Sequence, residues 1–420
     1  MWSSLAQNVK NINKHTILDL IRFTPGGISR VEIARRMDLT RAAVTANVND
    51  LLATGIIREA ESLNIPNGRP PVVLEINPTR GYVVGVDFGA SHISLLVADL
   101  AAHALEETEV PLDISQGPAV CLEQADQYLR ASLAKAGLSL KDILAIGVGV
   151  PGPIVAEAGI VLAPPIMPGW DRYPIRDTLE KKWGCPVSLN NDAGLGAMGE
   201  WAAGAGRGER NLAYIKVGTG IGCGLLLDGQ IYRGVSGSAG EIGHLTVDES
   251  GPTCSCGNQG CLEALAGGRA IAIQAREAVR RGQRTLLSNT PSIESLTTRE
   301  VAAAARNGDL LAQQILGRAG MFIGIALAGL VNLFNPGMVI IGGGVAQTGD
   351  ILLEPIRQAV QRRSLPAATR AVRITTAMLG RRSSSLGAVT QALTLALHQD
   401  ADRKEVMFTV KARPESLVVR

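Results

Sequence analysis

One short stretch of the chain gathers the side chains that bind transition metals. His244 is followed by Cys254, Cys256 and Cys261, a spacing of H-x9-C-x-C-x4-C. Three thiolates and an imidazole fill the four positions of a tetrahedral Zn²⁺ ion, so no position is left for a reacting water. The sequence therefore predicts a structural zinc site in the loop 244–263. Reduced cysteines that hold no metal are the alternative.

The segments around this loop alternate between apolar runs and glycine-rich turns. Residues 82–89 (YVVGVDFG) and 92–100 (HISLLVADL) predict a β-hairpin, and 212–229 (LAYIKVGTGIGCGLLLDG) repeats strand, glycine turn and strand. Two α/β halves of this similar plan predict the duplicated, hinged two-lobe architecture of actin-like ATPases and sugar kinases, which is ribonuclease H-like. We assign this core to residues 80–420, with its hinge near 193–210.

Length and composition narrow the class of protein. A chain of 420 residues exceeds one ordinary hydrophobic core, so two or three domains are expected. The net charge of +3 is too small to indicate a nucleic-acid partner by itself. The N-terminal residues 1–15 lack the apolar core of a signal peptide, and the cysteines outside 254–261 are scattered. The apolar stretch 320–334 is shorter than the roughly 20 residues that span a bilayer. We therefore expect a cytoplasmic protein without a membrane partner, in which 320–334 is a buried helix.

Residues 1–79 predict a small domain of three helices and two strands. From Val9, apolar side chains recur at helical spacing at Ile12, Thr16/Ile17 and Leu20/Ile21 and mark one face of the first helix. Short apolar strands are expected at 56–60 and 72–76, and the loop between them contains the sequence NGRPP. This order of helices and strands is typical of a winged helix-turn-helix.

The second and third helices carry clear start signals. Ser29 begins the second helix, and Glu32 three residues later completes a capping box. The turn 37–39 follows, and Thr40 caps the third helix. In a helix-turn-helix the later of these two helices enters the major groove of DNA.

The third helix exposes residues that are able to contact DNA. Val44, Val48 and Leu51 are expected to face inward, which leaves small and hydrogen-bonding side chains outside. The predicted DNA contacts are Thr40, Arg41, Ala42, Thr45 and Asn49, together with Arg69 of the wing. The partner would be palindromic double-stranded operator DNA, read by a homodimer or homotetramer. A three-helix dimerisation bundle is the alternative.

Five motifs together resemble the ROK family, named for repressors, open reading frames and kinases. They are VGVPGPI (148–154), NNDAGLGAMGEWAAGAGRG (190–208), VGTGIGCG (217–224), GSAGEIGHLTVD (237–248) and CSCGNQGCLE (254–263). The E-x-G-H followed by C-x-C-G-x-x-G-C-x-E is highly specific, whereas the glycine turns are weak signals by themselves. The resemblance covers nearly the whole chain and implies a regulator-type N-terminal domain joined to a sugar-kinase-like core.

The resemblance also implies a set of sugar-binding residues. They are Asn191, Asp192, Glu241, His244 and Glu263. Carboxylates and an amide that converge on a monosaccharide supply the acceptors and donors that its hydroxyls need. His244 would bind zinc through one ring nitrogen and face a sugar hydroxyl with the other. For Asp192 and Glu241, local helix capping is the alternative.

Two activities of the core are compatible with this resemblance. In an ATP-dependent sugar kinase, Asp192 would be the general base. The groups that would then hold Mg²⁺ and the phosphates are Asp87, Gly89, Gly218, Thr219, Gly220 and Gly222. Kinases of the family resemble D-x-G-G-T-K, but here the run is D-F-G-A-S-H, and the Cβ of Ala90 intrudes where the backbone should approach phosphate. We therefore expect a sugar-responsive transcriptional repressor with a structural zinc, and we keep the kinase as the alternative.

Overall fold

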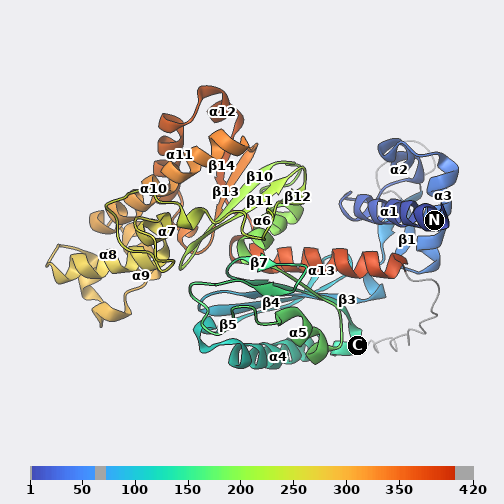
Figure 1. Cartoon of the computed structure of the whole chain (residues 1–420), viewed down its shortest axis with the longest axis horizontal. Coiled ribbons are helices and arrows are strands. Elements are labelled where there is room, and N and C mark those ends of the chain that lie inside the picture. Colours follow the sequence, from blue (N-terminus) through green and yellow to red (C-terminus); the bar gives the residue numbers. More distant parts are fainter. Residues whose placement is uncertain (1, 62–71, 403–420) are drawn as a thin grey trace, which may run out of the picture. The chain divides into compact units, whose positions relative to one another are not determined.

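The computed structural model describes residues 2–61 and 72–402 (Figure 1). The chain divides into two compact units by its internal contacts. One unit contains the chain up to Arg80 together with the described residues from Thr394 onward, and the other is Gly81–Leu393. Helix α13 (Ser383–Asp402) therefore contributes residues to both units.

The N-terminal unit has the predicted order of elements. Its helices and strands are α1 (Trp2–Arg22), α2 (Arg30–Met37), α3 (Arg41–Ala53), β1 (Ile57–Glu61) and β2 (Val72–Ile76). The two strands form an antiparallel hairpin, and Ile28 adds a single bridge to Leu74 at its edge. The predicted winged helix-turn-helix is confirmed.

Two details of this unit differ from the sequence-based expectation. The buried face of α1 carries Ile17 and Ile21 of the predicted stripe together with Leu18, whereas Ile12 is 61% exposed. The apolar stripe is therefore shorter than predicted. Ser29 caps α2 by accepting a hydrogen bond from the backbone N–H of Glu32 at 3.2 Å. The Glu32 carboxylate does not complete the capping box, because Arg35 and Arg36 of the same helix bind it.

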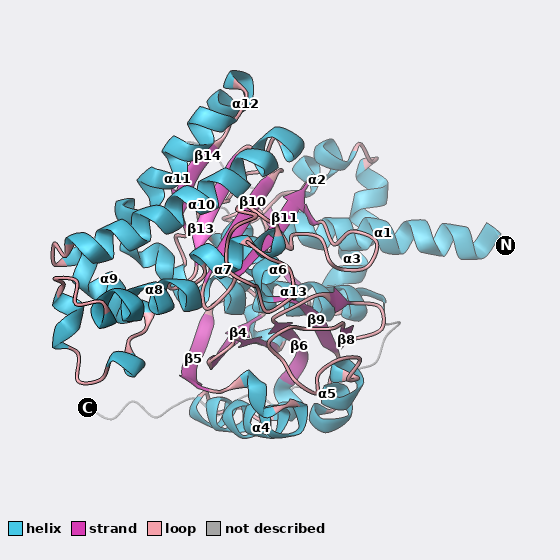
Figure 2. Ribbon diagram, turned by 60° about the vertical axis from the view of Figure 1, so that its left-hand side comes forward, coloured by secondary structure: helices cyan, strands magenta, loops and turns pink. Residues whose placement is uncertain are grey.

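The first lobe of the larger unit is a five-stranded sheet in the order β5-β4-β3-β6-β9. Its strands are β3 (Tyr82–Phe88), β4 (His92–Asp99), β5 (Ala104–Pro111), β6 (Ile143–Val150) and β9 (Val187–Asn191). The first three are antiparallel, and β6 and β9 run parallel to β3. Helices α4 (Pro118–Lys135) and α5 (Ile175–Trp183) cover one face of this sheet, as Figure 2 shows. The short hairpin of β7 (Ile154–Val155) and β8 (Ile160–Val161) lies outside it.

The second lobe repeats the same topology in the order β12-β11-β10-β13-β14. Its strands are β10 (Leu212–Val217), β11 (Ile221–Leu227), β12 (Gln230–Ile231), β13 (Met338–Gly342) and β14 (Arg373–Thr376). Its helices are α7 (Leu262–Ala266), α8 (Gly268–Arg280), α9 (Thr298–Arg306), α10 (Leu310–Phe334), α11 (Asp350–Arg363) and α12 (Pro366–Ala371). Three antiparallel strands followed by two parallel ones occur in both lobes, so the predicted duplicated two-lobe α/β core is confirmed.

Helix α10 is longer than the apolar stretch 320–334 that was expected to form it. Its 25 residues would suffice to cross a membrane by length and composition, but 67% of its most apolar window is buried inside the protein. Ile323 and Leu327 are fully buried in the cluster that includes Ile356 of α11. The helix therefore lies in the core of the second lobe.

Helix α6 (Asp192–Ala203) and helix α13 cross at close range because both carry glycine at the crossing. A Cβ on Gly199 would lie 2.0 Å from the backbone oxygen of Ser383, and one on Gly387 would lie 1.8 Å from that of Leu195. Larger residues would push the two helices apart. This contact fixes the start of α6, where two of the candidate site residues lie.

Candidate functional site

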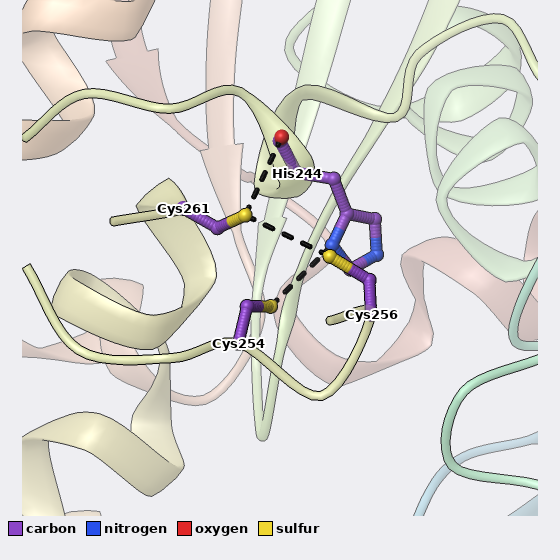
Figure 3. Close-up of side chains that lie close together, drawn as sticks. All are labelled: His244, Cys254, Cys256 and Cys261. Atoms are coloured by element: carbon purple, nitrogen blue, oxygen red, sulfur yellow. Dashed lines mark hydrogen bonds between the residues drawn. The ribbon is translucent and has the colours of Figure 1, made fainter. Parts of the chain in front are cut away.

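The four predicted zinc ligands converge in the loop that precedes α7 (Figure 3). Their ligand atoms all lie within 4.8 Å of one another. The Sγ atoms of Cys256 and Cys261 are 3.7 Å apart, and Cys254 Sγ is 3.7 Å from His244 Nδ1. With Zn–S bonds of about 2.3 Å, tetrahedral geometry places neighbouring sulfurs about 3.8 Å apart. The donor set and its spacing therefore fit a zinc ion with four protein ligands.

Glycine allows the loop to fold back around this centre. A Cβ on Gly260 would lie 1.6 Å from the backbone oxygen of Asp248, and its φ of +67° lies in the left-handed region. Bridges from Thr246 to Cys261 and from Thr253 to Gln259 close the loop. The cysteines are thus brought together by backbone pairing that only glycine permits at position 260.

His244 connects the cysteine cluster to an acidic residue. Its Nδ1 faces Cys254, and its Nε2 lies 4.0 Å from Oε2 of Glu241. Burial raises the pKa of Glu241; His244 opposes this effect, and the nearby Asp192 and Glu263 carboxylates add to it. The structure therefore brings four of the five predicted sugar residues near one another, because His244, Asp192 and Glu263 are all close enough to Glu241 to affect its pKa.

The fifth, Asn191, caps helix α6. Its Oδ1 accepts hydrogen bonds from the N–H groups of Ala193 and Gly194 at 2.9 and 3.2 Å, and its Nδ2 donates to the backbone oxygen of Gly152 at 3.0 Å. One N–H of the amide is left for another acceptor. The capping role that was the alternative for Asp192 is thus carried out by Asn191. Asp192 also contributes, because its Oδ1 accepts a hydrogen bond from the N–H of Ala193 at 2.8 Å.

Glu263 is held by the second glycine turn. Its Oε2 accepts a hydrogen bond from the N–H of Ile221 at 3.0 Å. A Cβ on Gly220 would lie 2.0 Å from that oxygen, so only glycine leaves room for the carboxylate. Gly222 lies against α6, where a Cβ on it would make a tight contact of 3.2 Å with the Cβ of Ala193. Gly220 and Gly222 therefore allow Glu263 and α6 to pack closely against the second glycine turn.

A cleft of about 950 Å³ lies beside these groups and is lined by Asp87, Gly218 and Thr219 among others. Gly89 is not among its lining residues. Gly89 is buried and lies against an imidazole, because a Cβ on it would lie 2.4 Å from Cε1 of His92. Burial, followed by the charge of Lys216, lowers the pKa of His92, so the ring is uncharged at neutral pH. The first turn therefore offers a neutral ring at the position where the family's kinases often have a basic residue.

Lys216 is a candidate site residue that the sequence analysis missed. It lies on β10, and its Nζ is 2.9 Å from Asp192 Oδ2 and 3.4 Å from Asp87 Oδ2. A lone lysine in an otherwise apolar strand was the available signal, because a buried ammonium requires a compensating charge.

Glu200 of α6 is a second residue that the analysis missed. It is fully buried and accepts hydrogen bonds from the backbone N–H groups of Ala205, Met378 and Leu379 and from the hydroxyl of Ser383. This carboxylate ties the loop before α13 to α6. Its role is to position the start of α13.

In the N-terminal unit, α3 presents the predicted outer face. Thr40 caps the helix by accepting from the N–H of Ala43 at 3.2 Å. Val44, Val48 and Leu51 are fully buried. Along the opposite side the exposed residues are Arg41, Ala42, Thr45, Ala46 and Asn49. Arg69, predicted to act in the wing, lies outside the described residues.

Comparison with known proteins agrees with both halves of this description. A family model described as the ROK family matches residues 83–394, and one for winged helix-turn-helix DNA-binding domains matches residues 10–58. The xylose repressor of Caldicellulosiruptor bescii is 32% identical over 386 residues, which is 92% of this chain and 96% of that protein.

Two solved structures extend the comparison. A ROK family transcriptional regulator, described as a homologue of the Escherichia coli Mlc protein, has a TM-score of 0.79 at 27% identity and covers 94% of this chain and 99% of its own. A ROK family glucokinase from Streptomyces griseus, in complex with glucose and AMPPNP, has a TM-score of 0.66 at 32% identity and covers 74% of this chain and 99% of its own. The chain therefore belongs to the ROK family and joins that family's two-lobe core to an N-terminal winged helix-turn-helix DNA-binding domain.

Proposed function

We propose that this ROK-family transcriptional repressor releases its operator DNA when a monosaccharide binds between the two lobes of its core. The sugar-binding groups are Asn191, Asp192, Glu241, His244 and Glu263. The protein acts in the cytoplasm as a homodimer or homotetramer on a palindromic operator. The DNA-binding groups are Thr40, Arg41, Ala42, Thr45, Asn49 and Arg69.

The observation that supports this proposal best is the position of His244 between the cysteine cluster and Glu241. One ring nitrogen lies 3.7 Å from a cysteine sulfur, and the other lies 4.0 Å from a carboxylate oxygen. Zinc bound by His244, Cys254, Cys256 and Cys261 would fix the ring and leave its Nε2 free to donate to a sugar hydroxyl. The zinc itself is structural, because the four residues fill its coordination sphere.

The sugar acts by favouring one arrangement of the lobes. Asn191 and Asp192 belong to the edge of the first lobe, and Glu241, His244 and Glu263 belong to the second. A ligand that contacts both sides stabilises the closed core by its differential affinity for that state. In a dimer, closure changes the spacing of the recognition helices, and operator half-sites fix that spacing at about 34–36 Å per helical turn of DNA.

An ATP-dependent sugar kinase is the second candidate function. It is favoured by Asp192, which stands at the start of α6 where a general base is expected, and by the glycines from 218 to 224. Two contacts weigh against it. His92 covers Gly89, and the ammonium of Lys216 is bound to the carboxylate of Asp192. We therefore assign sensing, not turnover, to the core.

A thermal-shift screen separates the two functions. Zinc-loaded full-length protein is heated with glucose, xylose or N-acetylglucosamine, each with and without ATP and Mg²⁺. A sensor gains stability from one sugar alone, by about 2.7 kcal/mol at a hundredfold excess over Kd, and shows no sugar-dependent ATP hydrolysis. Rapid ATP turnover with that sugar, abolished by Asp192→Ala, would replace the sensor with the kinase.

A further inference from the structure

Lys216 extends from the second lobe into a pair of carboxylates. Its Nζ lies 2.9 Å from Oδ2 of Asp192, 3.4 Å from Oδ2 of Asp87 and 3.3 Å from the hydroxyl of Ser384. These partners come from three separate elements: α6, β3 and α13. The side chains are largely shielded from water, with 18% exposed for Lys216, 15% for Asp192 and 3% for Asp87.

The surroundings make a cation at this point necessary. Two carboxylates that share a nearly dry space repel each other unless a positive charge lies between them. Within the described part of the chain, Oδ1 of Asp87 is buried and has no hydrogen-bond partner, so its charge depends on the ammonium that faces Oδ2. Burial disfavours the charge on Lys216, but Asp192 and Asp87 outweigh burial and raise the pKa of this amine. The lysine is therefore charged at every physiological pH.

A magnesium ion does not fit this arrangement. Mg²⁺ takes oxygen ligands at 2.0–2.1 Å in near-octahedral geometry and repels a neighbouring ammonium. Nζ of Lys216 already lies at hydrogen-bonding distance from the Asp192 oxygen. In a kinase, Asp87 would hold Mg²⁺ and Asp192 would be the general base. Here both carboxylates are bound to the ammonium of Lys216.

We propose that Lys216 is a built-in replacement for the divalent cation, so that the cleft beside Asp87 and Asp192 binds its ligand without a metal ion. This deepens the sensor assignment, on which it rests for the expectation that the core performs no phosphoryl transfer. The charge balance among Lys216, Asp87 and Asp192 does not depend on that assignment. An ordinary stabilising ion pair would predict a loss of stability when Lys216 is replaced, and nothing more. A cation replacement predicts in addition that the vacated carboxylate pair binds a metal.

The test is a Mn²⁺ titration of zinc-loaded full-length protein, read by the electron paramagnetic resonance signal of free Mn²⁺. The variants are wild type, Lys216→Met and the double variant Lys216→Met with Asp87→Asn. Methionine keeps much of the length of lysine and removes the charge. We expect one Mn²⁺ per chain in Lys216→Met, at least tenfold weaker binding in wild type, and loss of the site in the double variant. The melting temperature of Lys216→Met alone should rise with Mn²⁺.

Two results would overturn the proposal. One is wild-type protein that binds Mn²⁺ as tightly as Lys216→Met at a site that Asp87→Asn removes. The other is folded Lys216→Met, with its zinc retained, that binds no more Mn²⁺ than wild type. If Lys216→Met does not fold, Lys216→Ser is titrated in its place. None of these readouts involves DNA or sugar, so a failed repressor function would leave them unchanged.

Discussion

In the proposed function, His244 is the residue that serves both the zinc site and the sugar site. Its ring lies between the Sγ atom of Cys254 and the carboxylate of Glu241. Loss of the zinc would then free the ring to rotate and would remove a hydrogen-bond donor from the proposed sugar site. The two kinds of binding should therefore fail together.

Cys256→Ser tests this link directly. Wild-type protein should contain about one zinc per chain, and the variant should lose the zinc, much of its thermal stability and its sugar binding together. Cys185→Ser, a buried cysteine outside the cluster, is the control and should retain both metal and sugar. Metal content is measured by mass spectrometry, and sugar binding by calorimetry. Cys256→Ser protein that has no zinc but melts and binds sugar like wild type would refute the link.

Asp87 gives the stability a pH dependence of its own. Burial raises its pKa from 3.8 to about 6, although Lys216 acts in the opposite direction. The folded protein thus holds this proton more tightly than the unfolded chain. The contribution of this proton to the free energy of unfolding is fully present below about pH 4 and is lost as the pH rises through 6. Between pH 4 and 6.5 the free energy of unfolding of wild type should fall relative to Asp87→Asn, by up to about 3 kcal/mol. Urea titrations of both proteins at several pH values measure this free energy. Both proteins have the same zinc ligands, so the titration of those ligands cancels in the comparison. A difference between wild type and Asp87→Asn that does not change with pH would contradict the prediction.

At the scale of the element, α3 is the clearest functional unit. One side of the helix is buried, and the other exposes small alanines among Arg41, Thr45 and Asn49. Small residues let a helix approach the floor of the major groove, and arginine pairs with guanine through two hydrogen bonds. Sequence reading by this helix should therefore depend on Arg41 more than on any other single side chain of α3.

Arg41→Ala should weaken binding to the cognate operator by about 1–3 kcal/mol and relax the preference at one base position. The control is Arg280→Ala, an exposed arginine of α8 in the core unit, which should leave operator affinity unchanged. Fluorescence anisotropy with a set of single-base operator variants gives both quantities. If Arg41→Ala lost affinity equally for every base variant, Arg41 would contact phosphate and not a base.

Local signals explain why the elements could be predicted. Thr40 caps α3, β2 occupies the predicted residues 72–76, and the four predicted metal ligands converge. Each of these features depends on residues that are close together in the sequence. The stripe on α1 was less well predicted, since burial of Leu18 and exposure of Ile12 depend on which elements pack against the helix. Periodicity gives the helix but leaves its exact orientation to tertiary contacts.

Long-range contacts explain what the sequence did not give. Lys216 is 129 residues from Asp87 and 168 from Ser384, so no local pattern predicts that they meet. Glu200 likewise binds backbone groups more than 170 residues away. The sugar residues came from motif resemblance, and their proximity around Glu241 could be described only with the fold in hand.

At the scale of the whole molecule, one helix takes part in both units. Near the start of α13, the hydroxyl of Ser384 donates to the backbone oxygen of Asp192 at 2.9 Å. Near its end, His398 stacks on His15 of α1 with ring centroids 4.1 Å apart. Helix α13 thus contributes residues to the core unit and to the DNA-binding unit. The proposed coupling between sugar and operator must be reciprocal, so each ligand should weaken the binding of the other by the same factor.

An operator titration with and without the preferred sugar tests the central claim most directly. It compares wild type, Glu241→Ala and the control Glu249→Ala, which removes an exposed carboxylate from the same loop. In wild type and the control, sugar should weaken operator binding by about 1–3 kcal/mol, a five- to 150-fold change in Kd. Glu241→Ala should bind the operator as tightly as wild type without sugar and should not respond to sugar. A Glu241→Ala protein that released the operator at the same sugar concentration as wild type would contradict the proposed sugar site.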